Sequence, residues 1–131
     1  MRPWCWTSLA ALALIAAGCG PSKPPLAPVR GHVYFHGAPL AGGAIVFTPD
    51  PDRGGSGPLA CARIGEDGSY ALVTGADVGA AVGWHRVTFQ GHSPDAPPDA
   101  RLPARYSDPE TSGKVGEVKA GQSNVLDFQL D

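Results

Sequence analysis

The first indication of the fold comes from residues His32–Thr48, HVYFHGAPLAGGAIVFT. Its first five residues alternate polar and apolar, which places the valine and the phenylalanine on one face of a strand. Its last five residues, Ala44–Thr48, are apolar on both faces. Between them, Gly37–Pro39 is a turn that proline stiffens by fixing its φ. The stretch therefore predicts two short strands joined by a tight connection.

The rest of the chain repeats this pattern of short runs separated by turn residues. With 18 glycines and 14 prolines, no stretch shows the 3.6-residue period of a helix longer than one turn. Asp67-Gly68 is a strong hairpin signal. The further predicted strands are Ala60–Ile64, Ser69–Thr74, Trp84–Gln90, Val115–Val118 at an edge, and Val125–Leu130. We therefore expect an all-β fold, a seven-stranded two-sheet β-sandwich built from antiparallel hairpins.

Several of these stretches resemble one known family. Gly31–Phe47 is similar to the G-x-V-x-x-x-G-x-P-L-x-G-A-x-V-x-F opening of carboxypeptidase-regulatory-like domains, and Glu66–Leu72 to their D-G-x-Y-x-L hairpin. Val82–Val87 resembles a strand of the same family. Leu102–Asp108 and Val125–Leu130 resemble the tail of small planctomycete-type lipoproteins. The resemblance implies a transthyretin-like, Ig-like sandwich that serves as an accessory or binding module without a shared active site.

The N-terminus has the pattern of an export signal. Arg2 supplies a positive charge, and Leu9–Ala17 is an unbroken apolar run that is too short to cross a bilayer as a mature anchor. The ending Ala-Gly-Cys resembles the bacterial lipobox, although Ala16 stands where leucine is usual. That resemblance implies that Cys19 becomes the lipid-modified first residue of the mature protein.

The sequence therefore divides into three parts. The prolines of Gly20–Pro28 predict an extended tether after the lipidated cysteine, about 28 Å long at about 3.1 Å per residue. Gly20 stands where aspartate commonly retains lipoproteins in the inner membrane, which favours the outer membrane. The expected parts are a signal peptide over 1–18, a lipidated cysteine and tether over 19–28, and a carboxypeptidase-regulatory-like domain over 29–131.

Cysteine usage agrees with an exported lipoprotein. Cys5 leaves with the signal and Cys19 carries lipid, so that Cys61 remains alone and no internal disulfide can form. Cys61 lies in the apolar run Leu59–Ala62, which predicts a small buried side chain. No histidine or asparagine pattern accompanies it as a nucleophile would require.

Metal and cofactor sites are not predicted. His32 and His36 would share a strand face but stand about 13 Å apart, and His85 and His92 would lie on opposite faces, so we expect exposed or rim histidines. The carboxylates of Asp50–Asp52 could serve a hard cation, but their spacing matches no calcium loop, and solvated loop charges are the alternative.

Enzymatic activity and nucleic-acid binding are not expected either. The serines lack a nucleophile-elbow motif, and the Tyr-Arg-Gly-Ser ending of a transthyretin-like hydrolase is absent from the sequence, which ends in FQLD. The net charge is −2 and no Lys/Arg cluster occurs.

One possible interaction surface remains. Ser93–Asp108 is long and proline-rich for a loop of a sandwich. Tyr34, Trp84, Arg105 and Tyr106 are residue types that anchor interfaces. The alternative is that Tyr106 packs over the sandwich edge while the neighbouring Leu-Pro pair plugs its end.

The sequence thus predicts a lipid-anchored protein of the cell envelope, attached through Cys19, with a non-catalytic module for binding an envelope protein or glycan. A purely structural envelope component and a periplasmic carrier of a small ligand or cation are the alternatives.

Overall fold

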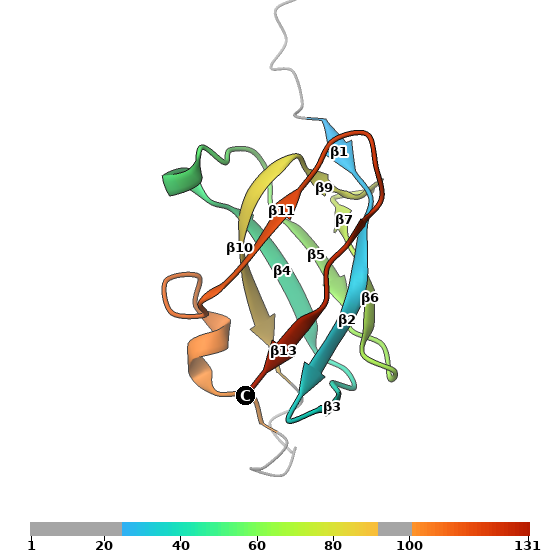
Figure 1. Ribbon diagram of the computed structural model, residues 1–131, viewed down its shortest axis with the longest axis vertical. Helices are drawn as coiled ribbons and strands as arrows, with labels where there is room; N and C mark the ends of the chain where they lie inside the picture. Colours follow the sequence, from blue (N-terminus) through green and yellow to red (C-terminus); the bar gives the residue numbers. More distant parts are fainter. Residues whose placement is uncertain (1–24, 92–100) are drawn as a thin grey trace, which may run out of the picture.

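The computed structural model describes residues 25–91 and 101–131 as an all-β sandwich (Figure 1), and this part of the chain contains no α-helix. The strands are β1 (Leu26–Ala27), β2 (Val29–Phe35), β3 (Ala38–Pro39), β4 (Ala44–Pro49), β5 (Ala60–Arg63), β6 (Ser69–Ala71), β7 (Val73–Thr74), β8 (Asp77–Val78), β9 (Ala80–Ala81), β10 (Gly83–Gln90), β11 (Lys114–Val118), β12 (Asn124–Val125) and β13 (Phe128–Leu130). Two 3₁₀ turns, η1 (Pro51–Arg53) and η3 (Ala104–Ser107), complete the described elements. The predicted fold class is confirmed, whereas the strand count differs from seven.

The larger sheet has the order β11-β10-β4-β5-β7-β8, with neighbours antiparallel throughout. Its centre is the long pairing of β10 with β4, from His85 opposite Pro49 to Gln90 opposite Ala44. β11 pairs with β10 alone, so the stretch predicted as an edge strand lies at an edge.

The second sheet is built around β2. β6 and β3 pair with β2 antiparallel, whereas β12 and β13 pair with it in parallel. Figure 1 shows β13 and β6 on opposite sides of β2. The expectation of purely antiparallel hairpins was therefore wrong for the C-terminal strand. No crossover helix is needed, because the chain reaches β12 from β11, the edge of the other sheet, and enters beside the start of β2.

The predicted hairpin at Asp67-Gly68 does not join two strands of one sheet. β5 pairs with β4 and β7, whereas β6 pairs with β2 across the sandwich. The turn itself is present, because Gly68 has a φ of 82° and its amide donates to the Gly65 carbonyl over 3.0 Å. The predicted strand Ser69–Thr74 divides at the buried Leu72, whose amide bonds to Val29 of one sheet before β7 joins the other.

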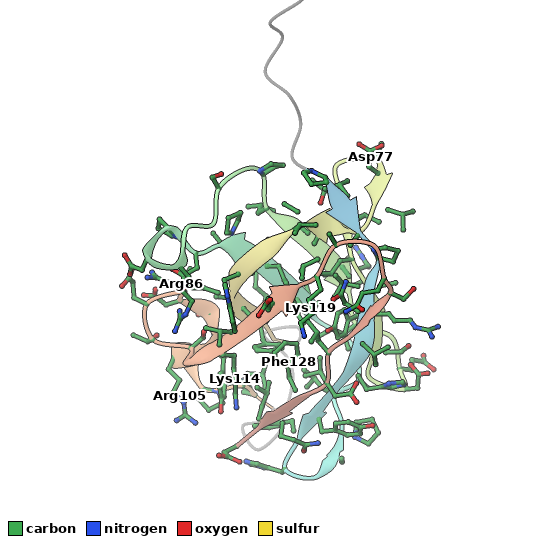
Figure 2. The ribbon with its side chains drawn as sticks, turned by 45° about the horizontal axis from the view of Figure 1, so that its top comes forward. Asp77, Arg86, Arg105, Lys114, Lys119 and Phe128 are labelled. Carbon is green, nitrogen blue, oxygen red and sulfur yellow. The ribbon has the colours of Figure 1, made fainter. Side chains whose placement is uncertain are left out.

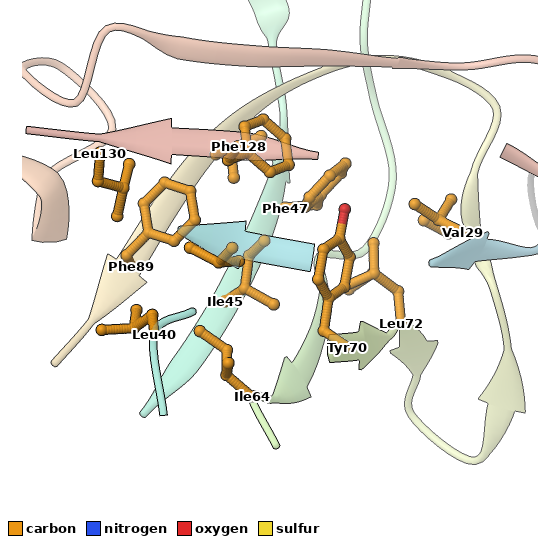
Figure 3. Packing of buried hydrophobic residues seen from close by; sticks show 14 of the residues in the cluster. Val29, Leu40, Ile45, Phe47, Ile64, Tyr70, Leu72, Phe89, Phe128 and Leu130 are labelled. Atoms are coloured by element: carbon orange, nitrogen blue, oxygen red, sulfur yellow. The ribbon is translucent and has the colours of Figure 1, made fainter. Parts of the chain in front are cut away.

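Aromatic rings fill the space between the sheets (Figure 3). The Phe128 ring meets Phe47 at 6.0 Å and Phe89 at 5.5 Å between centroids, both edge to face. Tyr70 lies 6.5 Å from Phe47 and completes the group. Such pairs contribute about 0.5–1.5 kcal/mol each beyond the burial of their area. The inward positions predicted by alternation therefore form one core.

A close approach of backbone occurs at Gly31. A Cβ at this position would lie 1.9 Å from the carbonyl oxygen of Leu126. Tyr70 is the ladder partner of Gly31, and its hydroxyl donates to the same Leu126 oxygen. Without a side chain at Gly31, the tyrosine can extend across β2 to the strand beyond.

The described chain begins in contact with the domain. β1 pairs with β9, and the amide of Val82 donates to the Pro25 carbonyl over 3.0 Å. Leu26 and Ala27, which the sequence assigns to the tether, thus belong to a strand, and Ala27 is buried. The signal peptide, Cys19 and the tether up to residue 24 lie outside the described residues. Among the residues that are described, none forms a helix with the length and apolar character of a membrane span.

Cys61 corrects another expectation, because its side chain is exposed. Only the alternate residues of β5 face the core: Ala60 is fully buried, while Leu59 before it is 51% exposed. The apolar run in the sequence is therefore distributed over both faces of the sheet.

Candidate binding face

The outer face of the β2 sheet carries polar and aromatic residues in a regular arrangement. Arg30, His32 and Tyr34 alternate outward along β2, while the valines and the phenylalanine between them are buried. The rings of His32 and Tyr34 stack at 6.3 Å between centroids with planes 23° apart. We call this surface, with its flanking residues on β6, β12 and β13, the β2 face.

Neighbouring strands supply the flanks of the β2 face. Arg30 lies between Ala71 of β6 and Val125 of β12. Tyr34 lies between Pro39 and Gln129. The side chain of Val125 is 59% exposed, which makes it an apolar wall beside the guanidinium-bearing residue.

The middle of the β2 face is bordered by two carboxylates. Oδ1 of Asp127 accepts the His32 amide over 2.8 Å and lies 4.0 Å from the His32 Nδ1. Oδ1 of Asp67 accepts both the hydroxyl and the amide of Ser69, over 2.6 and 3.1 Å. These bonds from Ser69 lower the pKa of Asp67. The carboxylate is therefore ionised at neutral pH.

A pocket of about 450 Å³, open to solvent, lies on this face. Its lining residues are Arg30, Gly31, His32, Asp67, Ser69, Tyr70 and Val125. Small-ligand sites have volumes of about 300–1,000 Å³ and combine apolar walls with a few polar groups. Within residues 25–91 and 101–131, no carboxylate pairs with Arg30. The β2 face thus offers a guanidinium group with no ionic partner among the described residues.

A second polar cluster lies on the outer face of the larger sheet, around Arg86 of β10. Its Nε lies 3.2 Å from Asp50, and its two terminal nitrogens lie 2.5 Å from Asp52 and 2.9 Å from Glu110. Arg53 pairs with Asp50 and places its guanidinium carbon 5.7 Å from the centre of the Trp84 ring. The cluster joins η1 and the loop before β11 to the sheet.

Neither expectation for Asp50 was right. The residue is fully buried, caps η1 by accepting the Asp52 amide, and faces arginines instead of a cation or open solvent. Burial by itself would raise its pKa, but the hydrogen bonds from Arg53 and Asp52 and the charge of Arg86 hold the pKa below the usual value. Nothing in the sequence indicates this burial, because Arg86 comes from β10, far from Asp50 along the chain.

The predicted surface of Tyr34, Trp84, Arg105 and Tyr106 is not one site. Tyr34 and Trp84 lie on the outer faces of opposite sheets. Tyr106 is buried, meets Phe89 edge to face at 6.1 Å, and accepts the Asp131 amide over 3.1 Å.

This packing matches the alternative in which Tyr106 covers the edge of the sandwich. Leu102 is partly buried and packs on the core. Arg105, which belongs to η3, stands over the Tyr106 ring, 4.6 Å from its centroid (Figure 2). Residues 93–100 of the predicted loop lie outside the described part.

His85 departs from the expectation of exposed histidines. It is 1% exposed and packs 5.6 Å from the Phe47 ring. Its Nε2 lies 2.7 Å from the Ala81 carbonyl, to which it can only donate, and its Nδ1 has no hydrogen-bond partner among the residues that the structure describes. Burial lowers the pKa of this imidazole despite the backbone bonds. His36 is exposed, whereas His92 lies outside the described residues.

No group of three or more histidine, cysteine, aspartate or glutamate residues in the described ranges could hold a metal ion. Comparison of the chain with protein-family models, with curated proteins and with solved structures found no match. The β2 face and its pocket are therefore judged on their own chemistry.

Sequence reasoning found part of this face. Alternation along β2 placed His32 and Tyr34 on one side, but Arg30 lay outside the predicted strand. Asp67 and Asp127 were missed as site residues, because nothing in the sequence shows that the strands beside them flank β2.

Proposed function

We propose that this protein is a lipid-anchored lipoprotein of the cell envelope whose carboxypeptidase-regulatory-like sandwich is a non-catalytic binding module. The observation that carries the anchor is the N-terminal sequence: a charged start, an apolar run and Cys19, followed after six residue steps by Pro25, where contact with the domain begins. Two acyl chains on such a cysteine hold a protein stably on a membrane.

The spacing favours a definite orientation. Six residues can span at most about 20 Å, so a lipid at Cys19 keeps the end of the sandwich with β1 and β9 near the membrane surface. The C-terminus and β3 lie at the opposite end of the molecule (Figure 1). The β2 face runs along the side between these ends and remains accessible.

Binding is favoured over a purely structural role by the pocket of the β2 face. The pocket brings together the donors of Arg30, the carboxylate of Asp67 and the exposed apolar side chain of Val125, a combination that is typical of ligand sites and that a spacer does not need. We expect the partner to be an envelope protein or glycan, reached without nucleic acid, metal or cofactor.

Detergent partitioning tests the anchor. The wild-type chain expressed in a bacterial host should enter the detergent phase, and Cys19→Ala should remain in the aqueous phase. Cys61→Ala is the matched control and should partition like wild type, since its thiol belongs to the domain. Continued partitioning of Cys19→Ala would contradict the proposal.

Capture from solubilised envelope tests the binding role. A stoichiometric partner that is lost when Arg30 is replaced by glutamine supports recognition through the β2 face. Absence of any partner favours the structural component instead.

A further inference from the structure

The pocket on the β2 face combines hydrogen-bond donors, hydrogen-bond acceptors and an apolar wall. Arg30 supplies donors, Asp67 and Asp127 supply acceptors at its borders, and Val125 supplies an apolar wall. We propose that this pocket binds a carboxylate-bearing sugar residue of an acidic polysaccharide. The inference deepens the proposed binding function and rests on it.

The charge balance selects a carboxylate over a phosphate. A guanidinium binds a carboxylate through two parallel hydrogen bonds, and Arg30 has no carboxylate partner in the described part of the chain. The two aspartates nearby repel a dianion more strongly than a monoanion. A single negative charge accompanied by hydroxyl groups therefore fits better than a phosphoryl group.

The acceptors suit hydroxyl groups. The hydrogen bonds that Asp67 and Asp127 accept within the described residues all reach Oδ1. Oδ2 of each carboxylate thus keeps its capacity to accept. Sugar hydroxyls are the donors that such acceptors bind beside a carboxylate on the same ring.

The rings of His32 and Tyr34 extend the site along the strand. The two rings stack with planes 23° apart and both side chains are half-buried, which leaves part of each amphipathic ring exposed beside the pocket. The C–H face of a pyranose packs on such rings. Because the pocket is open, a free monosaccharide would be poorly enclosed, whereas a polymer running past Tyr34 gains contacts along the β2 face.

Calorimetry on the full-length protein in detergent micelles tests the proposal, with trigalacturonate as the probe. We expect saturable binding that weakens about tenfold or more in Arg30→Gln, because one charge-assisted pair is lost. Arg63→Gln, which removes an exposed arginine of the other sheet, is the matched control and should bind like wild type. Equal melting temperatures of the two variants would show that the fold is kept.

Two further comparisons address the ligand and the rings. The methyl ester of trigalacturonate keeps the hydroxyls without the charge and should bind about tenfold more weakly. Tyr34→Ala should weaken binding while Tyr34→Phe, which keeps the ring, should retain it.

The proposal that the pocket binds an acidic sugar would be overturned by any of three results. These are the absence of saturable heat, equal binding of the acid and its ester, and tighter binding of a tri-aspartate peptide. A stoichiometric envelope partner and a Cys19-dependent anchor would still stand in that case, so the two proposals fail separately.

Discussion

The hydroxyl of Tyr70 on β6 donates a hydrogen bond to the carbonyl oxygen of Leu126, which lies on the far side of β2. This bond spans β2 beneath Gly31 and joins β6 to the segment between β12 and β13. It also occupies the gap between β12 and β13, where the ladder to β2 is interrupted. The bond is partly buried, and burial of Tyr70 raises the pKa of its phenol, which therefore remains protonated and a donor over the whole physiological range.

Loss of the Tyr70 hydroxyl should destabilise the fold. In Tyr70→Phe the Leu126 carbonyl loses its side-chain donor, which costs about 1–3 kcal/mol when an acceptor is left buried. Urea denaturation measures the change. Tyr34→Phe, on the outer face, removes a hydroxyl without a bond in the described residues and serves as the control. Equal losses in both variants would argue against the role of the bond.

Gly31→Ala should be more disruptive than its size suggests. The added methyl would lie 1.9 Å from the Leu126 oxygen, so the backbone of β12 and β13 must shift away from β2. We expect a loss of at least about 2 kcal/mol. Gly116→Ala is a milder reference, because its nearest neighbour is the Phe47 side chain at 3.1 Å. If both variants unfold at the same urea concentration, the close approach is not a constraint.

Gly68 and Gly75 both have a positive φ, but only Gly68 has neighbouring atoms where a Cβ would lie. Its φ is 82°, and a Cβ would lie 2.7 Å from the Val33 carbonyl oxygen. Gly75 has a φ of 60° with no atom within 4 Å of such a Cβ. Gly75→Ala should therefore cost only the strain of a left-handed residue, about 1 kcal/mol, and Gly68→Ala clearly more. Thermal melts of the two variants give the difference, and a Gly68→Ala variant as stable as Gly75→Ala would refute it.

His85 should make the protein less stable in mild acid. Its pKa is lowered in the folded state from the ordinary 6.5, so below that pH the unfolded chain binds more protons. Its contribution to stability is complete above about pH 6.5 and decreases as the pH falls from there towards the folded-state pKa.

Denaturation at about pH 7.5 and about pH 5.5 tests this, with His85→Gln as the variant that keeps a donor for Ala81 but cannot titrate. The loss of unfolding free energy between these two pH values should be smaller in His85→Gln than in the wild-type protein. It should persist in His36→Gln, which replaces an exposed histidine. A decrease of the same size in all three proteins would assign it to other groups.

Asp50 should be essential for the cluster around Arg86. Asp50→Asn removes the charge that faces Arg53 and Arg86 in a buried position, so the melting temperature should drop. Asp52→Asn, whose side chain is 79% exposed, should change it much less. The reverse order would show that the surface pair dominates. High salt should reduce the decrease in melting temperature caused by Asp52→Asn more than the decrease caused by Asp50→Asn.

Much of the fold could be predicted from the sequence, because alternation within a strand is a local property. Val33, Phe35 and Phe128 face the core as expected. Cys61 was misjudged because a short apolar run does not reveal which alternate positions point inward.

The errors at longer range have a different cause. The partners of β6 and β13 depend on where the chain crosses between sheets, and that choice is made by contacts such as Tyr70 with Leu126. The burial of Asp50 depends likewise on Arg86, which is remote in the sequence. Asp67 and Asp127 of the candidate site were missed for the same reason.

The attachment of the N-terminal segment to the domain has a mechanical consequence. The chain enters through β1, which is bonded to β9, and continues into β2, the strand with which all other strands of the second sheet pair. Asn124 adds a side-chain bond to the Pro28 carbonyl over 3.2 Å. Tension applied to the chain before Pro25 therefore acts first on the hydrogen bonds of β1 with β9 and on the bond between Asn124 and Pro28. It then acts along β2, whose hydrogen bonds to the neighbouring strands are loaded in shear at the same time.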